Sequence, residues 1–185
     1  MPFRRFFDRR RRARLAYTIY RAAVERAREP YFYAALNVPD SVDGRFDMVV
    51  LHAFLLLRRL GRVEGQGADE AKALAQTLFD LMFADMDQNL REMGVSDLAV
   101  GRKVRQMAEA FYGRIAAYDK AIAEGEQALA DALARNLYRS AAEARTEDAL
   151  AMAGYLLAQD AHLAAAGTEP LLAGTIAFAP LEAPQ

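Results

Sequence analysis

The sequence predicts an all-α protein: a single helical domain of about six to eight helices around a buried central helix at about residues 43–60. Apolar side chains recur at helical spacing in segment after segment of the 185 residues, which is the main signal for amphipathic helices. Glycine, proline and capping residues stand at the ends of these segments. No internal repeat, low-complexity tract or hairpin signal interrupts them. These three observations favour one helical domain.

Charge divides the chain unevenly. Residues 1–28 carry ten arginines against Asp8 and Glu25, a net charge of +8, while the rest of the chain carries −9 and the whole chain −1. Such an asymmetry predicts an anionic partner near the N-terminus, either phospholipid headgroups or nucleic acid. We therefore divide the chain into a basic N-terminal arm (1–14), a helical domain (15–167) and an extended or disordered C-terminal tail (168–185).

The arm has two interpretations. It is either a frayed terminus whose arginines keep it soluble, or a binding arm in which Phe3, Phe6 and Phe7 lie among arginines. A binding arm would contact anionic headgroups at a membrane interface or the phosphates of ribosomal RNA. The contact residues would then be Arg4, Arg5, Arg9, Arg10, Arg11 and Arg12.

The elements before the central helix are short or amphipathic. Apolar spacing predicts a helix over residues 13–28, which Pro30 stops. Tyr31, Phe32 and Tyr33 follow in a short helical turn, and an aromatic cluster between two helices is typical of a core plug. Ser41 or Asp43 can then cap the next helix.

The central helix is the most apolar segment of the chain. Between Phe46 and Leu57 only Asp47 and His52 are polar, and a helix that is apolar nearly all round belongs inside a core. Its apolar runs are shorter than the ~20 residues that cross a bilayer. We expect it to end at Gly61.

Four more helices are predicted after the glycine-containing linker at residues 63–68. The first runs from about 69 to 93 and ends at Gly94, which has the chemistry of a helix C-cap. Ser96 caps the next segment, and Gly101 is expected to kink or restart the helix, which continues over about 102–123. Further helices follow at about 126–138 and 146–167.

The sequence offers no motif for catalysis or for a metal site. Cysteine is absent and there are only two histidines, which excludes a thiolate or Cys–His zinc site. The residues three before His52 and His162 are Val49 and Gln159, so a Glu-x-x-His di-iron motif is absent. No phosphate-binding glycine loop occurs. We therefore predict no catalytic residue, no metal and no cofactor, and a protein that is not an enzyme.

Three segments carry a resemblance to a known family. They are the run Asp43-Gly-Arg-Phe-Asp-Met with His52 and Arg58-Arg59, residues 83–104 (FADMDQNLREMGVSDLAVGRKV), and residues 107–114 (MAEAFYGR). With these segments the chain resembles the ubiquinol–cytochrome c chaperone family over roughly residues 14–165, and it resembles the shorter bacterial form.

The resemblance implies a helical assembly factor for respiratory complex III. Mitochondrial members of the family bind newly made cytochrome b and work with a small partner protein near the ribosomal exit tunnel. By this resemblance the client is cytochrome b, held by the charged and aromatic surface of residues 45–59 and 83–114. The candidate partner-binding residues are Arg45, Asp47, His52, Arg58, Asp85, Asp87, Asn89, Arg91, Lys103, Phe111, Tyr112 and Arg114.

Two other functions remain open from the sequence. One is a haem- or quinone-handling helical protein that uses His52, and the other is a peripheral membrane- or ribosome-binding module that acts through the arginine-rich N-terminus. No specific DNA binding is expected. Because the N-terminus lacks the apolar core of a secretory signal, we expect a cytoplasmic protein, peripheral on the cytoplasmic face of the inner membrane if the arm binds lipid.

Overall fold

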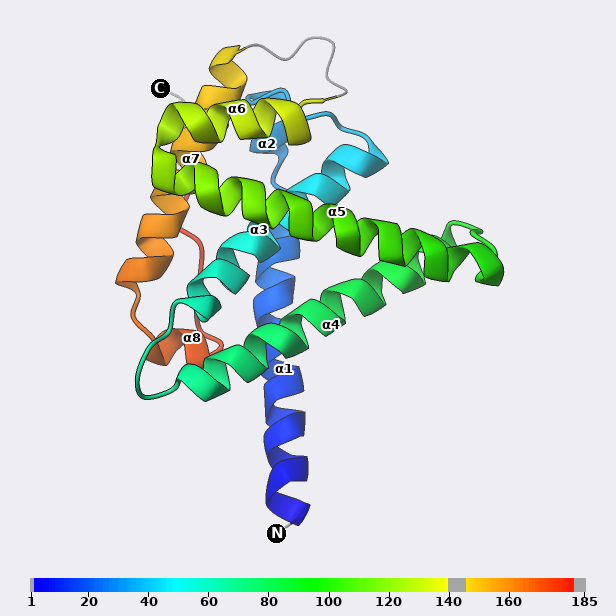
Figure 1. The fold of residues 1–185 in the computed structure, drawn as a ribbon, viewed down its shortest axis with the longest axis vertical. Helices are drawn as coiled ribbons and strands as arrows, with labels where there is room; N and C mark the ends of the chain where they lie inside the picture. Colours follow the sequence, from blue (N-terminus) through cyan, green and yellow to red (C-terminus); the bar gives the residue numbers. More distant parts are fainter. Residues whose placement is uncertain (1, 140–145, 182–185) are drawn as a thin grey trace.

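The computed structural model describes residues 2–139 and 146–181, with side chains from residue 7 onward. Within these residues there are eight helices and no strands (Figure 1), so the predicted all-α class is confirmed. The helices are α1 (Pro2–Ala27), α2 (Pro30–Ala34), α3 (Val42–Gly61), α4 (Ala68–Glu92), α5 (Asp97–Glu124), α6 (Glu126–Asn136), α7 (Thr146–Ala165) and α8 (Glu169–Ala173).

Helix α3 is the buried centre of the fold, as the sequence predicts. It packs against α1, α4, α5 and α7, and most of its residues are buried. The Ser41 hydroxyl caps its first turn by accepting a 3.1 Å hydrogen bond from the Gly44 N–H. A helix that is apolar nearly all round can bury all of its faces only when neighbours surround it, and here four do.

The first turn of α3 depends on a close backbone approach at Gly44. A Cβ atom at this position would lie 1.9 Å from the Pro39 carbonyl oxygen. No side chain fits in that space, so the connection from α2 lies directly on the start of α3. This contact fixes where the polar residues at the start of α3 stand.

Helix α1 is continuous from Pro2 to Ala27. The expected arm and the first core helix are thus one helix, with no break at residue 14. Arg12 marks where α1 reaches the body, because its Nη2 donates to Glu70 of α4 at 3.0 Å. The turns before Arg12 project beyond the other helices (Figure 1).

Helices α4 and α5 form an antiparallel pair whose turn projects from the body; the two helices meet at this turn and diverge away from it (Figure 1). Gly94 ends α4 as predicted, with a positive φ of 82°, and the next N–H, from Val95, donates to the Leu90 carbonyl at 3.0 Å. The expected kink or restart at Gly101 is wrong. Helix α5 runs unbroken from Asp97 through Gly101, since one glycine in a helix costs only about 1 kcal/mol relative to alanine.

Residues 169–179 pack against the rest of the fold instead of trailing away. The short helix α8 lies within the segment expected to be an extended or disordered tail, and it buries Leu171. Beyond it, Ile176 and Phe178 are buried in the core, while the side chain of Gln159 on α7 pairs with the backbone of Ala179. The Ala179 N–H donates to Oε1 at 2.8 Å, and Nε2 donates to the Ala179 carbonyl at 3.2 Å.

The apolar side chains of the helices pack against neighbouring helices. None of the helices in the described part of the chain combines the length and the hydropathy needed to cross a membrane. Even α3 carries charged residues at both ends.

Candidate binding groove

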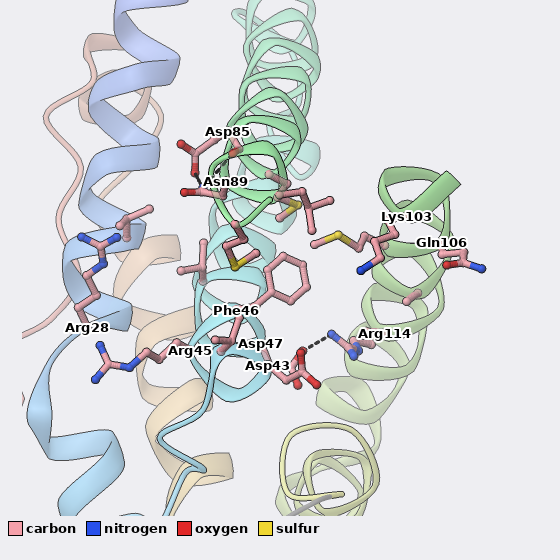
Figure 2. Close-up of a pocket in the computed structure, with 18 of the residues that line it drawn as sticks. Arg28, Asp43, Arg45, Phe46, Asp47, Asp85, Asn89, Lys103, Gln106 and Arg114 are labelled. Atoms are coloured by element: carbon pink, nitrogen blue, oxygen red, sulfur yellow. Dashed lines mark hydrogen bonds and ion pairs between the residues drawn. The ribbon is translucent and has the colours of Figure 1, made fainter. Parts of the chain in front are cut away.

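A groove of about 880 Å³ lies between α1, α3, α4 and α5 (Figure 2). Each of the four helices turns one face to it. Its lining comes from the C-terminal half of α1, the first turns of α3, the end of α4 and the middle of α5. Arg139, which follows α6, also reaches the groove.

The floor of the groove is apolar and rich in methionine. Its members are Val24, Phe46, Val49, Met86, Leu90, Met93 and Met107. Methionine side chains are flexible and polarisable, and they adapt to apolar partners of different shape. The floor is therefore suited to an apolar segment of another protein more than to one rigid small molecule.

Asp47 is the most buried charge of the groove, at 6% exposed. Its two carboxylate oxygens accept hydrogen bonds from Arg114 of α5 and, at 2.7 Å, from Arg139. Burial raises the pKa of the Asp47 carboxyl, and the two guanidinium groups act in the opposite direction. Because each oxygen accepts from a different guanidinium group, Asp47 fixes two arginines at the groove wall.

Asp85 of α4 is held in a similar way on the other side. The Tyr20 hydroxyl of α1 donates to its Oδ2 at 2.8 Å, and Asn89 donates to the same oxygen at 3.2 Å. Burial and the bond to Asp85 both raise the pKa of Tyr20, so the phenol stays protonated and remains a donor. Asp85 thus ties α1 to α4 across the groove.

The groove keeps two cations on opposite rims. Arg28 and Lys103 stand on opposite sides of the cavity in Figure 2, and among the described residues neither has a carboxylate within ion-pair distance. Arg45 differs, because it pairs with Asp40 and lies over the Tyr33 ring, 5.4 Å from its centroid. The open cations therefore lie where they could meet acidic groups that flank an apolar segment.

Half of the candidate partner residues meet in this groove. They come from three stretches of the sequence that are far apart. The six candidates that line the groove are Arg45, Asp47, Asp85, Asn89, Lys103 and Arg114.

His52, by contrast, lies in the core and is fully buried. Its Nδ1 lies 2.8 Å from the Met48 carbonyl, which only accepts, so Nδ1 carries the proton. Its Nε2 then accepts from the Tyr155 hydroxyl at 2.8 Å. Burial lowers the pKa of His52 to about 4, which keeps the ring neutral. Both nitrogens are engaged within the protein, so the geometry does not favour His52 as a haem ligand.

The other candidates outside the groove have structural partners. Arg58 is buried and pairs with Asp119 of α5 and, at 2.9 Å, with Asp160 of α7. Phe111 lies in the core against Phe79 and Phe83, whose ring centroids are each 5.7 Å from its own.

The last three candidates lie on the surface of the α4–α5 pair. Asp87 and Arg91 pair at 2.6 Å one turn apart, and Arg91 also binds Asp97 across the turn. Tyr112 is exposed, with its ring centroid 5.4 Å from that of Phe79. None of the three lines the groove.

Some groove residues lie outside the candidate set. Tyr20 and Val24 of α1 line the groove, as does Arg28 just after the helix. Their i, i+4, i+8 spacing puts them on one helical face, so a face analysis of the first helix could have found them. Arg139 stands outside any helix, and no sequence pattern links it to Asp47.

The described residues contain no cluster of three or more His, Asp or Glu side chains placed to hold a metal ion. The groove instead combines an adaptable apolar floor, fixed ion pairs and two open cations. Such an arrangement is suited to binding an apolar segment that carries acidic groups.

Comparisons with known proteins agree with the resemblance in the sequence. The family described as "Ubiquinol-cytochrome C chaperone" matches residues 34–178. The ubiquinol–cytochrome c reductase complex assembly factor 1 of Xenopus laevis is 30% identical over 122 residues, covering 66% of this chain and 59% of that protein. The mouse protein of the same name is 27% identical over 167 residues, covering 90% of this chain and 55% of its own length.

A solved structure matches nearly the whole chain. The crystal structure of the Cbp3 homolog from Brucella abortus superposes with a TM-score of 0.82 at 34% identity and covers 97% of both chains. The curated animal relatives are longer, and this chain spans between half and three-fifths of their length.

Proposed function

Because this chain belongs to the ubiquinol–cytochrome c chaperone family, we propose that it is a non-catalytic assembly factor whose groove holds newly made cytochrome b during biogenesis of the ubiquinol–cytochrome c reductase complex. The relatives from Xenopus laevis and mouse are named as assembly factors of this complex, and these names support a role in its assembly. The groove supports the mode of action, since its apolar floor and its charged rims offer a surface for a partner.

The observation that carries the proposal is the methionine floor between charged rims. A newly made membrane subunit exposes apolar helices that must be covered until their own partners arrive. An amphipathic or apolar helix fits a hydrophobic groove through side chains at i, i+3, i+4 and i+7. Met86, Met93 and Met107 can adapt to such side chains, and Arg28 and Lys103 can bind acidic residues at either end of the segment.

Release needs no chemical step in this scheme. The client leaves when its own partner subunits bind it more strongly than the groove does, because a binding protein shifts an equilibrium only by its differential affinity. We expect this exchange on the cytoplasmic face of the membrane into which the client inserts.

A pull-down from gently solubilised membranes of the native host, followed by mass spectrometry, tests the proposal. We expect cytochrome b to be enriched with the wild-type protein and several-fold reduced with Met93→Asp, which puts a charge on the groove floor. Leu98→Asp is the matched control, since Leu98 is 97% exposed and lies outside the groove, whereas Met93 is 57% exposed within it.

Equal recovery of cytochrome b by both variants would show that the groove is not the binding site. Absence of cytochrome b from the wild-type pull-down would show that cytochrome b is not the client. The same spectra report on a small partner protein and on ribosomal proteins, which are the other partners that the resemblance implies.

A further inference from the structure

One face of α1 points away from the core and carries two aromatic rings among three arginines. Phe7, Arg10, Arg14, Tyr17 and Arg21 follow one another at spacings of three and four residues, which places them in one row along the helix. The opposite face of α1 carries the buried Ala16, Ile19 and Ala23. The row therefore lies on the outer side of the molecule.

The row exposes large aromatic groups. Phe7 is 65% exposed and Tyr17 is 57% exposed. The arginines between them would be enough to keep this face of the helix soluble, so solubility does not explain the two rings. Arg14 is exposed as well, and Arg21 pairs with Glu25 at 3.1 Å near the end of the row. Arg12, by contrast, points to the body and pairs with Glu70, so α1 separates an anchoring side from an outer side.

Aromatic rings interspersed with guanidinium groups match the surface of an anionic bilayer. Arginine binds the headgroup phosphates, and each basic residue near the surface contributes about 1 kcal/mol. Aromatic rings favour the level of the headgroups and the upper acyl chains. Nucleic acid phosphates would account for the arginines, but they give an exposed Phe7 no apolar phase to enter.

We propose that the outer row of α1, from Phe7 to Arg21, docks the protein on anionic phospholipid headgroups with the helix lying along the bilayer surface. The row spans fifteen residues, and the fourteen steps between its ends, at about 1.5 Å each, make it about 21 Å long. The proposal adds Arg14, Tyr17 and Arg21 to the basic arm considered from sequence, and it leaves Arg12 to the body.

The row also leads into the groove. Continuing from Arg21 at the same spacing, the next two positions are Val24 and Arg28, and both line the groove. A docked α1 therefore holds the mouth of the groove at the bilayer surface. Docking itself needs no client, so failure of this proposal and failure of the proposed function would be seen in separate experiments.

Tryptophan fluorescence provides the test, because the chain contains no tryptophan. Phe7→Trp and Tyr17→Trp are made one at a time in the full chain, and the protein is mixed with vesicles of phosphatidylcholine alone or with phosphatidylglycerol added. We expect a blue shift at both positions only with the anionic vesicles. Tyr112→Trp, at a position 59% exposed on α5, should not shift.

The double variant Arg10→Gln/Arg14→Gln should lower the vesicle partition coefficient roughly 25-fold, from about 1 kcal/mol per arginine and tenfold per 1.4 kcal/mol. The control Arg102→Gln/Arg105→Gln removes the same charge from exposed positions on α5 outside the groove. The proposal is overturned if the wild-type protein does not bind anionic vesicles, or if the two double variants lose affinity equally. Salt-sensitive binding to ribosomes without vesicle binding would replace lipid with RNA.

Discussion

At the scale of single residues, polar groups in this protein act as ties between helices. Asp47 joins α3 to Arg114 and Arg139, Asp85 joins α4 to Tyr20, and Arg58 joins α3 to α5 and α7. Buried charges of this kind need partners, because desolvation costs several kcal/mol per ion. The ties around Asp47 and Asp85 leave the groove with fixed walls.

His52 makes folding stability depend on pH. The pKa of His52 is about 4 in the folded protein, against an ordinary value of 6.5. Between these two pH values the histidine is therefore protonated in the unfolded chain and neutral in the folded protein. The free energy of unfolding therefore falls as pH falls from 6.5 towards 4, by roughly 2 kcal/mol between pH 7 and pH 5. Urea unfolding at the two pH values measures it.

His52→Gln should flatten this dependence, since it removes the titrating group and keeps a donor and an acceptor. His162→Gln is the matched control, because His162 is exposed in the last turn of α7 and is the only other histidine. The same slope in wild type and His52→Gln would contradict the role of His52.

From the sequence, charged and polar residues of interest can be identified, but binding residues cannot be distinguished from residues that hold the fold together. Sequence analysis identified charged residues of the wall, such as Asp47 and Asp85, but it grouped them with His52 and Arg58. The partners that distinguish the two sets lie 102 or 103 positions away, at Asp160 and Tyr155. A single sequence contains no signal for such pairs.

At the scale of elements, the start of α3 is the most constrained point. Gly44→Ala should lower the free energy of unfolding by roughly 1–3 kcal/mol, the range for overpacking, because its Cβ would meet the Pro39 carbonyl. It should also disturb the groove wall, which carries Arg45 and Asp47. Thermal unfolding and client recovery would measure the two effects.

Gly113→Ala makes the same chemical change in α5, but it is expected to raise the free energy of unfolding. A Cβ at Gly113 would have no atom within 4 Å, so the substitution should stabilise α5 by roughly 0.5–1 kcal/mol. If both variants lost stability equally, the close approach at Pro39 would not be the cause.

Helix ends were predictable wherever a cap or a breaker marked them. Ser41 and Gly94 each stand where the sequence analysis expected them, because capping depends on local chemistry. Gly101 misled the prediction, since the packing of α5 outweighs the weak helix propensity of one glycine. The C-terminal residues were missed for a related reason: Ile176 and Phe178 pack singly, without a helical period.

At the scale of the whole molecule, the segment after α8 packs against α3 and the C-terminal end of α1. Phe178 packs edge-on against His52, with ring centroids 5.2 Å apart, and Arg26 of α1 lies 5.8 Å from its ring centroid. The C-terminal segment thus closes the core beside α1 and α7.

Phe178→Ala should lower the free energy of unfolding by about 3 kcal/mol, the lower end for truncating a buried phenylalanine. Chemical denaturation measures the loss. Ala177→Ser changes an exposed neighbour in the same segment and should have little effect. If Phe178→Ala were as stable as the wild type, the segment would not contribute to the core.

The ties at Asp47 also bear on when the groove can exist during synthesis. Its two partners, Arg114 and Arg139, are 67 and 92 residues away in the sequence, and contacts of such separation require large loop closures that slow folding. A chain still emerging from the ribosome has no Arg139 for its Asp47 until most of its length is made. The chaperone therefore becomes competent late, and until then its own methionine floor is an apolar surface in need of cover.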